Sequence, residues 1–303
     1  MSLYQTSPAV AEALAQGRPV VALESTIITH GMPWPQNLEM ARTVEQTVRD
    51  AGAEPATIAV MDGTLYIGLT DDQLVALAQA QNVAKLSRAD LAACMAMGGT
   101  GATTVAATMI AAAQAGIAVF ATGGIGGVHK GAELSFDISA DLPELAQTPV
   151  NVVAAGAKAI LDIPKTLEVL ETQGVPVIAV GQDALPAFWS RESGIKAPLR
   201  MDQPAQIAKA FAMRRALGLP GGQLIANPVP EADEIPADVM LPYITQATAE
   251  AEAKGITGKS VTPFLLQRIF ELTDGRSLKT NIALVLNNAR LAAQIAQELS
   301  ALP

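Results

Sequence analysis

Short apolar runs of strand length alternate with longer helical stretches over the first 180 residues, and this alternation restricts the fold more than any other feature of the sequence. Apolar runs of this kind are typical of strands that are buried on both faces of a parallel sheet. The stretches between them must then cross over and cover the sheet. We expect strands at residues 19–23, 57–61, 83–86, 117–121, 150–154 and 176–180.

The helices expected between these strands are residues 36–51, 71–80, 88–97, 103–115 and 166–173. Beyond residue 200 the pattern is more helical, with stretches at 203–217, 240–254, 262–273 and 278–299. The sequence therefore predicts an α/β fold of three layers, α/β/α, with a central, mostly parallel sheet and a helical C-terminal part. The proline- and glycine-rich segment 217–222 is typical of a turn rather than a boundary, so residues 1–303 are expected to form a single domain.

The composition favours a globular protein with a small ligand. Half of the 303 residues are hydrophobic (50%) and only 16% are charged, which allows a large core. The net charge of -9 repels the backbone of a nucleic acid, so we expect no nucleic acid polymer as a partner.

The compartment is expected to be the cytoplasm. The single cysteine, Cys94, excludes an internal disulfide framework, and it lies in an apolar run that favours a buried position over a nucleophile. The first residues lack the pattern of a signal peptide. The most apolar window, 109–127, is interrupted at Gln114-Ala115-Gly116, so we expect no membrane span.

Polar residues that directly follow apolar strands are the first candidates for chemistry, because ligands of open α/β sheets gather at the carboxyl ends of the strands. The run 19–23 leads into Glu24-Ser25-Thr26. Partial burial there would favour the protonated carboxyl group of a general acid. A glutamate on the surface at a strand end remains the alternative.

Two lysines interrupt apolar segments. Lys158 follows the run 150–154 and has apolar neighbours, and a position near a helix N-terminus would favour the neutral, nucleophilic amine that forms Schiff bases. Lys85 interrupts the run 83–86 and could hold a phosphate. A solvated helix lysine and a lysine that protects a sheet edge are the respective alternatives.

Two glycine-rich turns, 98–104 and 122–129, offer free backbone N–H groups that could hold a phosphate or a carbonyl. Neither completes a dinucleotide fingerprint, because His129 stands at the last glycine position of the second turn. The segment 136–141 adds Asp137, Ser139 and Asp141, hard oxygen ligands that suit Mg²⁺ or Mn²⁺. An Asx-turn or a helix N-cap is the alternative for these aspartates.

Together, segments 23–33, 101–109, 120–129 and 136–141 resemble the signature blocks of the pseudouridine-5'-phosphate glycosidase family, also called the indigoidine synthase A-like family. The segments 156–158 and 279–283 extend the resemblance over nearly the whole chain. The resemblance implies reversible cleavage of pseudouridine 5'-phosphate to uracil and ribose 5-phosphate. It also implies Mn²⁺ or a similar divalent cation as cofactor, and a homotrimer.

The resemblance implies a role for each matching residue. Glu24 would be the proton donor and acceptor, Lys158 the covalent nucleophile, and Asp137 the Mn²⁺ ligand. The residues implied to contact the substrate are Lys85, Val105, Ser139, Ala140, Asp141, His129 and Asn281.

Two rival functions stay open at this point. A Schiff-base aldolase or an N-nucleosidase would share the sugar-phosphate pocket and cut a different bond. A catalytically silent sugar-phosphate sensor would keep the glycine-rich turns and need neither Lys158 nor Glu24.

Overall fold

The computed structural model describes residues 3–302, and one 11-stranded sheet runs through them. Its order is β1-β4-β3-β2-β7-β8-β11-β9-β10, with β6 pairing to β3 and β5 to β6. The strands are β1 (Tyr4–Thr6), β2 (Val20–Leu23), β3 (Glu54–Met61), β4 (Thr64–Ile67), β5 (Ala84–Leu86), β6 (Gly101–Thr103), β7 (Val119–Ala121), β8 (Asn151–Ala154), β9 (Val177–Val180), β10 (Leu199–Met201) and β11 (Gln223–Ala226).

The sheet is mostly parallel, as predicted. β2, β7, β8, β11 and β9 pair in parallel with their neighbours, and every residue of β2, β7, β8 and β11 is buried. The antiparallel pairs are β3 with β4 and β3 with β6. A two-residue turn, Asp62-Gly63, joins β3 to β4, and both residues have positive φ (50 and 76°), the conformation that a tight hairpin requires.

Helices cover both faces of the sheet and confirm the α/β/α prediction. One group of contacting helices comprises α3 (Gln36–Asp50), α10 (Pro204–Ala216) and α13 (Arg276–Ser300), and the other comprises α6 (Val105–Gln114), α8 (Asp141–Gln147) and α9 (Ile163–Thr172). The remaining α-helices are α1 (Pro8–Ala15), α2 (Thr26–His30), α4 (Asp71–Gln79), α5 (Leu91–Ala96), α7 (Ala132–Ser135), α11 (Ala237–Ala253) and α12 (Val261–Leu272).

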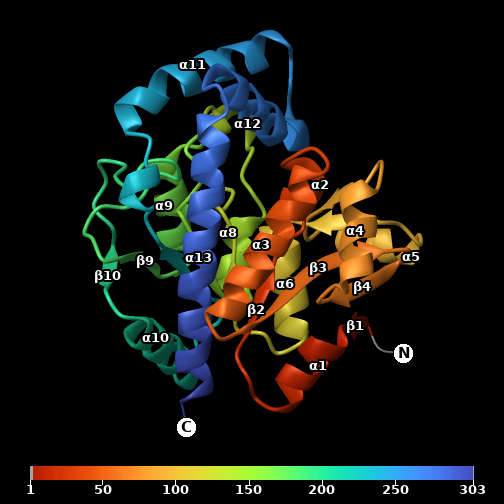
Figure 1. Ribbon diagram of the computed structural model, residues 1–303. Coiled ribbons are helices and arrows are strands. Elements are labelled where there is room, and N and C mark those ends of the chain that lie inside the picture. The colour runs from red at the N-terminus through yellow and green to blue at the C-terminus, as the bar shows by residue number, and fades with distance from the viewer. Residues whose placement is uncertain (1–2, 303) are drawn as a thin grey trace.

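The 25-residue helix α13 runs along the middle of the sheet (Figure 1). Its buried positions Leu284, Asn288, Leu291 and Ile295 recur at helical spacing and form one face. That face contacts β7, β2 and β8, while α3 and α10 pack beside it. Figure 1 also shows α11 and α12 at the same end of the molecule as α2, the helix that follows β2. The predicted helical C-terminal part is thus confirmed.

The boundaries of several predicted elements are wrong. The helix predicted from residue 103 begins at Val105, because Gly101–Thr103 form β6 and pair with β3 and β5. The helix predicted at 88–97 is reduced to Leu91–Ala96. The short strands β1, β4, β6, β10 and β11 were not predicted. The assignment of residues 1–303 to one domain stays a prediction.

Among residues 3–302, no helix is both long and apolar enough to cross a membrane.

Candidate active site at the carboxyl ends of β2, β7 and β8

Three neighbouring parallel strands end at the same level and place the first candidate residues side by side. Leu23 of β2 pairs in register with Ala121 of β7, and Ala121 pairs with Val153 of β8. Glu24 and Thr122 are the next residues after the first two strands, so they lie next to each other at the sheet edge. This is the edge at which ligands bind in open α/β sheets.

Two threonine hydroxyls hold the carboxylate of Glu24. Thr26 Oγ1 donates a hydrogen bond to Glu24 Oε2, and Thr122 Oγ1 donates one to Glu24 Oε1. Glu24 is partly buried, which makes it a positioned carboxylate rather than the freely solvated surface glutamate of the alternative reading.

A buried hydroxyl network fixes the strand ends behind Glu24. Ser25 Oγ donates to the Ile58 carbonyl (2.6 Å) and accepts from the Thr103 backbone N–H (2.9 Å). Thr103 Oγ1 donates to the same carbonyl (2.7 Å) and accepts from Thr108 Oγ1 (2.9 Å). These bonds join β2, β3 and β6 and leave little freedom to the segment that carries Glu24.

Helix α13 braces Thr122 from the other side. Asn288 is fully buried, and its Nδ2 donates to the Thr122 carbonyl oxygen (2.8 Å). Asn288 Oδ1 accepts from Asn227 Nδ2 (3.0 Å), which follows β11. Buried amides are costly unless they are hydrogen-bonded, so this pair defines the position of Thr122. No motif in the sequence assigned a role to Thr26, Thr122 or Asn288.

Lys158 lies on a continuation of β8. The Ile125 N–H donates to the Gly156 carbonyl (3.1 Å), and the Lys158 N–H donates to the Ile125 carbonyl (3.1 Å). The glycine-rich turn after β7 and the segment after β8 therefore run side by side beyond the sheet. The expected position of Lys158 near a helix N-terminus is wrong, because Gly156 (φ 79°) turns the chain and α9 starts only at Ile163.

Lys85 and Lys158 form a local excess of positive charge. Both are partly buried, and neither forms a hydrogen bond or an ion pair through its ammonium group within the described part of the chain. Burial lowers the pKa of Lys85, the nearby charge of Lys158 lowers it further, and the charges of Glu24 and Asp141 oppose this. Partly buried ammonium groups that form no direct ion pair are suited to bind an anion such as a phosphate.

Asp141 connects the glycine-rich turn to the start of α6. Its Oδ1 accepts from the Ala106 N–H (3.0 Å), and its Oδ2 accepts from the Gly126 N–H (2.7 Å). A Cβ added at Gly126 would lie 2.3 Å from Ser139 Oγ and 2.8 Å from Asp141 Oδ2, so only glycine fits there. The buried carboxylate thus holds the glycine-rich turn against the start of α6. This positioning role is additional to the substrate contact predicted for Asp141.

His129 and Asp137 face each other across a hairpin formed by residues 127–139. The His129 N–H donates to the Asp137 carbonyl (3.0 Å), and the Ser139 N–H donates to the Gly127 carbonyl (3.0 Å). Burial lowers the pKa of His129, the Asp137 charge opposes this, and the charges of Lys158 and Lys85 add to the lowering. His129 therefore lies within electrostatic range of both lysines.

The described residues contain no group of three or more His, Cys, Asp or Glu side chains that could hold a metal ion. Asp137 is partly buried and has His129 as its neighbour in the hairpin. A divalent cation at Asp137 would therefore need water for most of its ligands, which is ordinary for Mg²⁺ and acceptable for Mn²⁺.

The remaining predicted contact residues surround this edge. Val105 is the first residue of α6, and Ala140 is the N-cap of α8. Asn281 lies one turn before Leu284 and Val285, whose side chains approach Gly123 of the glycine-rich turn. Two buried polar atoms, Asn281 Oδ1 and Thr104 Oγ1, have no hydrogen-bond partner in the described residues. Such atoms are costly to bury and are available to a ligand.

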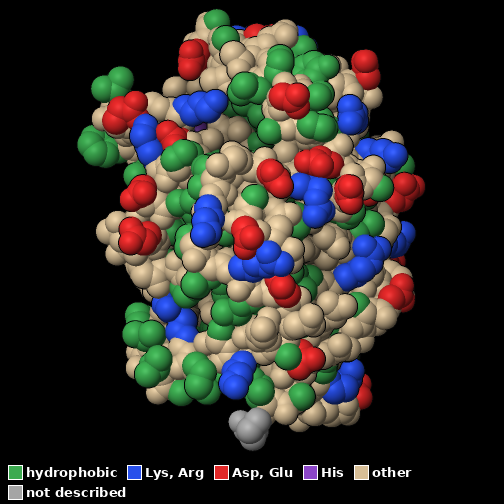
Figure 2. Space-filling model, turned by 90° about the vertical axis from the view of Figure 1, so that its left-hand side faces the viewer, with side chains coloured by type: hydrophobic (Ala, Val, Ile, Leu, Met, Phe, Trp, Pro, Cys, Tyr) green, Lys and Arg blue, Asp and Glu red, His purple; other side chains and the backbone are tan. Residues whose placement is uncertain are grey.

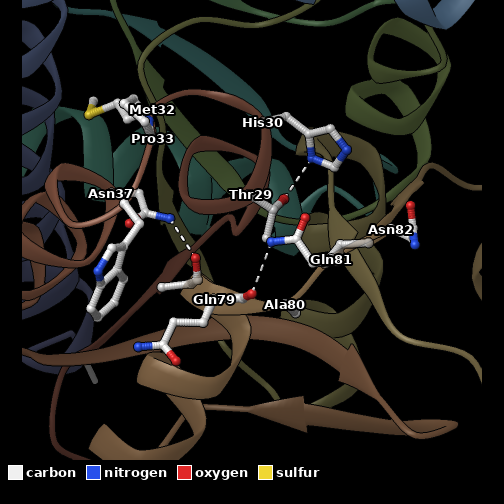
Figure 3. Close-up of a pocket in the computed structure, with 12 residues that line it drawn as sticks. Thr29, His30, Met32, Pro33, Asn37, Gln79, Ala80, Gln81 and Asn82 are labelled. Carbon is white, nitrogen blue, oxygen red and sulfur yellow. Dashed lines mark hydrogen bonds between the residues drawn. The ribbon is translucent and has the colours of Figure 1, made fainter.

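A separate surface cavity of about 550 Å³ adjoins this edge but contains neither Glu24 nor Lys158 (Figure 3). Thr29 and His30 point into it and share a hydrogen bond between Oγ1 and Nδ1 (2.6 Å). Its other lining residues are Met32, Pro33, Trp34, Asn37, Ala78, Gln79, Ala80, Gln81, Asn82 and Val83. The cavity lacks paired carboxylates and unpaired lysines, so we assign the chemistry to the strand ends.

The face of the molecule in Figure 2 carries acidic and basic side chains interspersed with apolar ones. On that face, Lys and Arg do not gather into a single stripe of the kind that follows a nucleic acid backbone.

The chain matches the family model described as indigoidine synthase A like protein over residues 9–298. It is 74% identical to a protein of Roseobacter denitrificans over 97% of this chain and 95% of the relative. It is 72% identical to one of Jannaschia sp. (97% of each chain) and 61% identical to one of Deinococcus radiodurans (98% and 95%). All three are named pseudouridine-5'-phosphate glycosidase.

Two solved structures have a similar fold. One is the prealnumycin C-glycosynthase AlnA in complex with ribulose 5-phosphate, with a TM-score of 0.92 and 40% identity over 99% of this chain and 98% of that chain. The other is an indigoidine synthase A-like protein from Thermotoga maritima, with a TM-score of 0.87 and 34% identity over 94% of each chain.

Proposed function

This chain belongs to the indigoidine synthase A-like family, and we propose that it is an enzyme that reversibly cleaves pseudouridine 5'-phosphate to uracil and ribose 5-phosphate. The relatives that share the glycosidase name cover almost the whole chain. The structural observation that carries the proposal is the convergence of Glu24, at the carboxyl ends of the strands, with two lysines whose ammonium groups form no direct ion pair within the described residues.

The bond that is cleaved requires an amine rather than a second carboxylate. A C-glycosidic bond has no oxygen or nitrogen leaving group to protonate, so the two-carboxylate mechanism of ordinary glycosidases does not apply. In the proposed mechanism the bond from C1' to the ring oxygen breaks and the oxygen keeps the electron pair, while the Lys158 amine bonds to C1'. The proton that this nitrogen loses goes to the released oxygen, which becomes the C4' hydroxyl. Glu24 then gives its proton to uracil C5, and the C1'–C5 bond breaks as the C1'=N imine forms.

Water hydrolyses the imine, which releases ribose 5-phosphate and restores the Lys158 amine. In the reverse direction, ionised Glu24 takes the proton from C5. One residue thus acts as acid in cleavage and as base in synthesis.

Lys85 is the residue that we assign to the phosphate, because its ammonium group is partly buried and forms no direct ion pair within the described residues. Asn281 Oδ1, a buried acceptor without a donor, would accept from an N–H or O–H group of the substrate. Val105, Ser139, Ala140, Asp141 and His129 complete the proposed contacts.

Asp137 is the residue that we assign to Mn²⁺ or a similar divalent cation, with water as most of the coordination shell. The support is its partly buried carboxylate on the hairpin that also carries His129 and Ser139. A cation there would balance negative charge on bound oxygen atoms.

The rival functions are less well supported. The solved relative AlnA is named a C-glycosynthase and binds ribulose 5-phosphate, which favours C-glycosidic chemistry on a sugar phosphate over an aldolase or an N-nucleosidase. A silent sensor would not require the positioned Glu24.

The deciding experiment combines product analysis with trapping of the imine. The wild type, Lys158→Ala and the exposed-lysine control Lys209→Ala are incubated with ribose 5-phosphate and borohydride and analysed by mass spectrometry. We expect a reduced adduct on the wild type and on Lys209→Ala alone, and release of uracil from pseudouridine 5'-phosphate by the same two proteins. If no protein carries an adduct, the covalent mechanism is wrong. If uracil is not released, the substrate is wrong.

A homotrimer and a cytoplasmic location complete the proposal. The tip of the 127–139 hairpin exposes Leu134 (87%), Phe136 (81%) and Ile138 (43%), and such an apolar tip is typical of a surface that another copy covers. Light scattering of the purified protein measures the mass, and a monomer would reject the trimer. The single cysteine, which is buried, suits a reducing compartment.

A further inference from the structure

The carboxylate of Glu24 has two hydrogen-bond partners to which the function proposed above assigns no role. Each oxygen accepts one threonine hydroxyl, from Thr26 in α2 and from Thr122 after β7. Thr122 is 2% exposed, and its carbonyl is fixed by the fully buried Asn288. The register of β2 and β7 therefore holds at least one of these hydroxyls in place.

Hydroxyl partners differ from ammonium or backbone N–H partners in one property that matters here. A hydroxyl both donates and accepts, whereas an N–H group only donates. A carboxylate needs donors, and a protonated carboxyl group needs an acceptor for its own proton. Two hydroxyls can therefore satisfy both states of Glu24 without moving a heavy atom.

We propose that Thr122 and Thr26 are positioning residues that stabilise the Glu24 carboxyl group in both protonation states, so that it can act as acid in cleavage and as base in synthesis. This inference rests on the function proposed above. In cleavage the proton leaves the Glu24 carboxyl group for C5, and the electron pair of the C5=C6 bond receives it. The C1'–C5 pair then restores that double bond while the Lys158 nitrogen forms the imine. The carboxylate left on Glu24 accepts both hydroxyls.

The other charged groups near Glu24 remain unchanged in this scheme. Lys85 on β5 is close enough for the Glu24 charge to act on it. Lys158, Asp141 and Lys259 act on Lys85 in turn, and the two histidines, His30 and His129, lie within range of the Lys85 charge and belong to the same cluster. Replacing a threonine changes none of these charges, so a shift in pH dependence would report the lost hydroxyl.

The test is a comparison of pH–rate profiles in both directions for the wild type, Thr122→Val and Thr122→Ser. Cleavage needs protonated Glu24 and loses rate on the alkaline side, whereas synthesis needs ionised Glu24 and loses rate on the acid side. Loss of one donor favours the protonated carboxyl group. In Thr122→Val we therefore expect the alkaline limb of the cleavage profile and the acid limb of the synthesis profile to move to higher pH. The expected shift of each limb is about one unit, a tenfold change in proton concentration. Thr122→Ser, which keeps the hydroxyl, should restore the wild-type profile.

Thr148→Val is the matched control, because Thr148 is also a buried threonine whose hydroxyl donates to a carboxylate, that of Glu144 rather than that of Glu24. It should lower thermal stability and leave both limbs in place. If Thr122→Val does not fold, Thr26→Val removes the second hydroxyl and should shift both limbs in the same direction.

Limbs that stay in place in a folded, active Thr122→Val protein, or that move in opposite directions, would overturn the inference. A profile that Thr122→Ser does not restore would do so as well. A wild type without turnover would instead reject the proposed function, and the inference with it, so the two failures can be told apart.

Discussion

Replacing Asp141 by Asn tests whether this carboxylate holds the site together or only contacts the substrate. The two side chains have nearly the same shape. In the protein, both carboxylate oxygens accept backbone N–H groups, at 3.0 Å from Ala106 and at 2.7 Å from Gly126. An amide keeps one acceptor and turns an NH₂ group towards the other N–H.

The cost follows from these two bonds. A hydrogen bond to a charged group contributes about 1.5–3 kcal/mol, and a buried donor left without an acceptor costs about 1–3 kcal/mol. Asp141 is only 5% exposed, so water cannot replace the lost partner, and we expect a total loss of about 3 kcal/mol. An unfolding entropy of about 2.1 cal/mol/K per residue over 303 residues converts this loss into a decrease in Tm of about 5 °C.

Calorimetry and urea unfolding of wild type and Asp141→Asn measure this loss. Asp162→Asn is the matched control, because Asp162 caps α9 through the Lys165 N–H (3.1 Å) and Asn caps a helix about as well. The control should change stability by less than about 1 kcal/mol. An Asp141→Asn protein with unchanged Tm and reduced activity would refute the bridging role and leave only a substrate contact.

Three further predictions concern the fold and its pH dependence. Asn288→Ala should lower the free energy of unfolding by about 2–4 kcal/mol, measured in urea, because the Thr122 carbonyl and Asn227 lose their buried partner. Gly222→Ala should cost more than about 4 kcal/mol, since the new Cβ would lie 1.9 Å from the Val150 carbonyl oxygen. Gly174→Ala, with φ 70° and open space, should cost about 1 kcal/mol in the same assay. Burial and then the Lys158 charge lower the pKa of Lys85, so between that lowered value and 10.5 the unfolded chain binds more protons than the folded one. The free energy of unfolding should therefore rise with pH in this window, and Lys85→Met should lose this rise. Unfolding curves of both proteins at several pH values measure it, and an equal dependence on pH in the two proteins would contradict the prediction.

The layers of the fold could be predicted from the sequence because buried parallel strands are continuous apolar runs. The run that contains β2 and the run that contains β8 are examples. The three-residue strands β6 and β10 could not be predicted, because neither lies in an apolar run of the kind that contains the equally short β5 and β7. Both form only through their partner strands. Thr103 in β6 was assigned to the following helix for that reason.

The candidate site could be predicted only where a motif singled out a residue. Glu24 follows an apolar strand, and that position led to it directly. Asn288 could not be found, because a polar residue in a helix usually faces solvent and only the packing of α13 buries it. The roles assigned to the site residues, their metal and the trimer stay predictions.

Helix α13 has a consequence for how the protein is made. The ribosome completes this helix after every strand that it covers, so a nascent chain exposes the apolar face of β2, β7 and β8 until Leu284, Asn288 and Leu291 emerge. Until then the Thr122 carbonyl lacks its hydrogen bond from Asn288, so the Thr122 hydroxyl that holds Glu24 is not fixed in position. Partly synthesised chains are thus both aggregation-prone and inactive. We expect them to depend on chaperones more than the nascent chains of a protein whose sheet is covered early in translation.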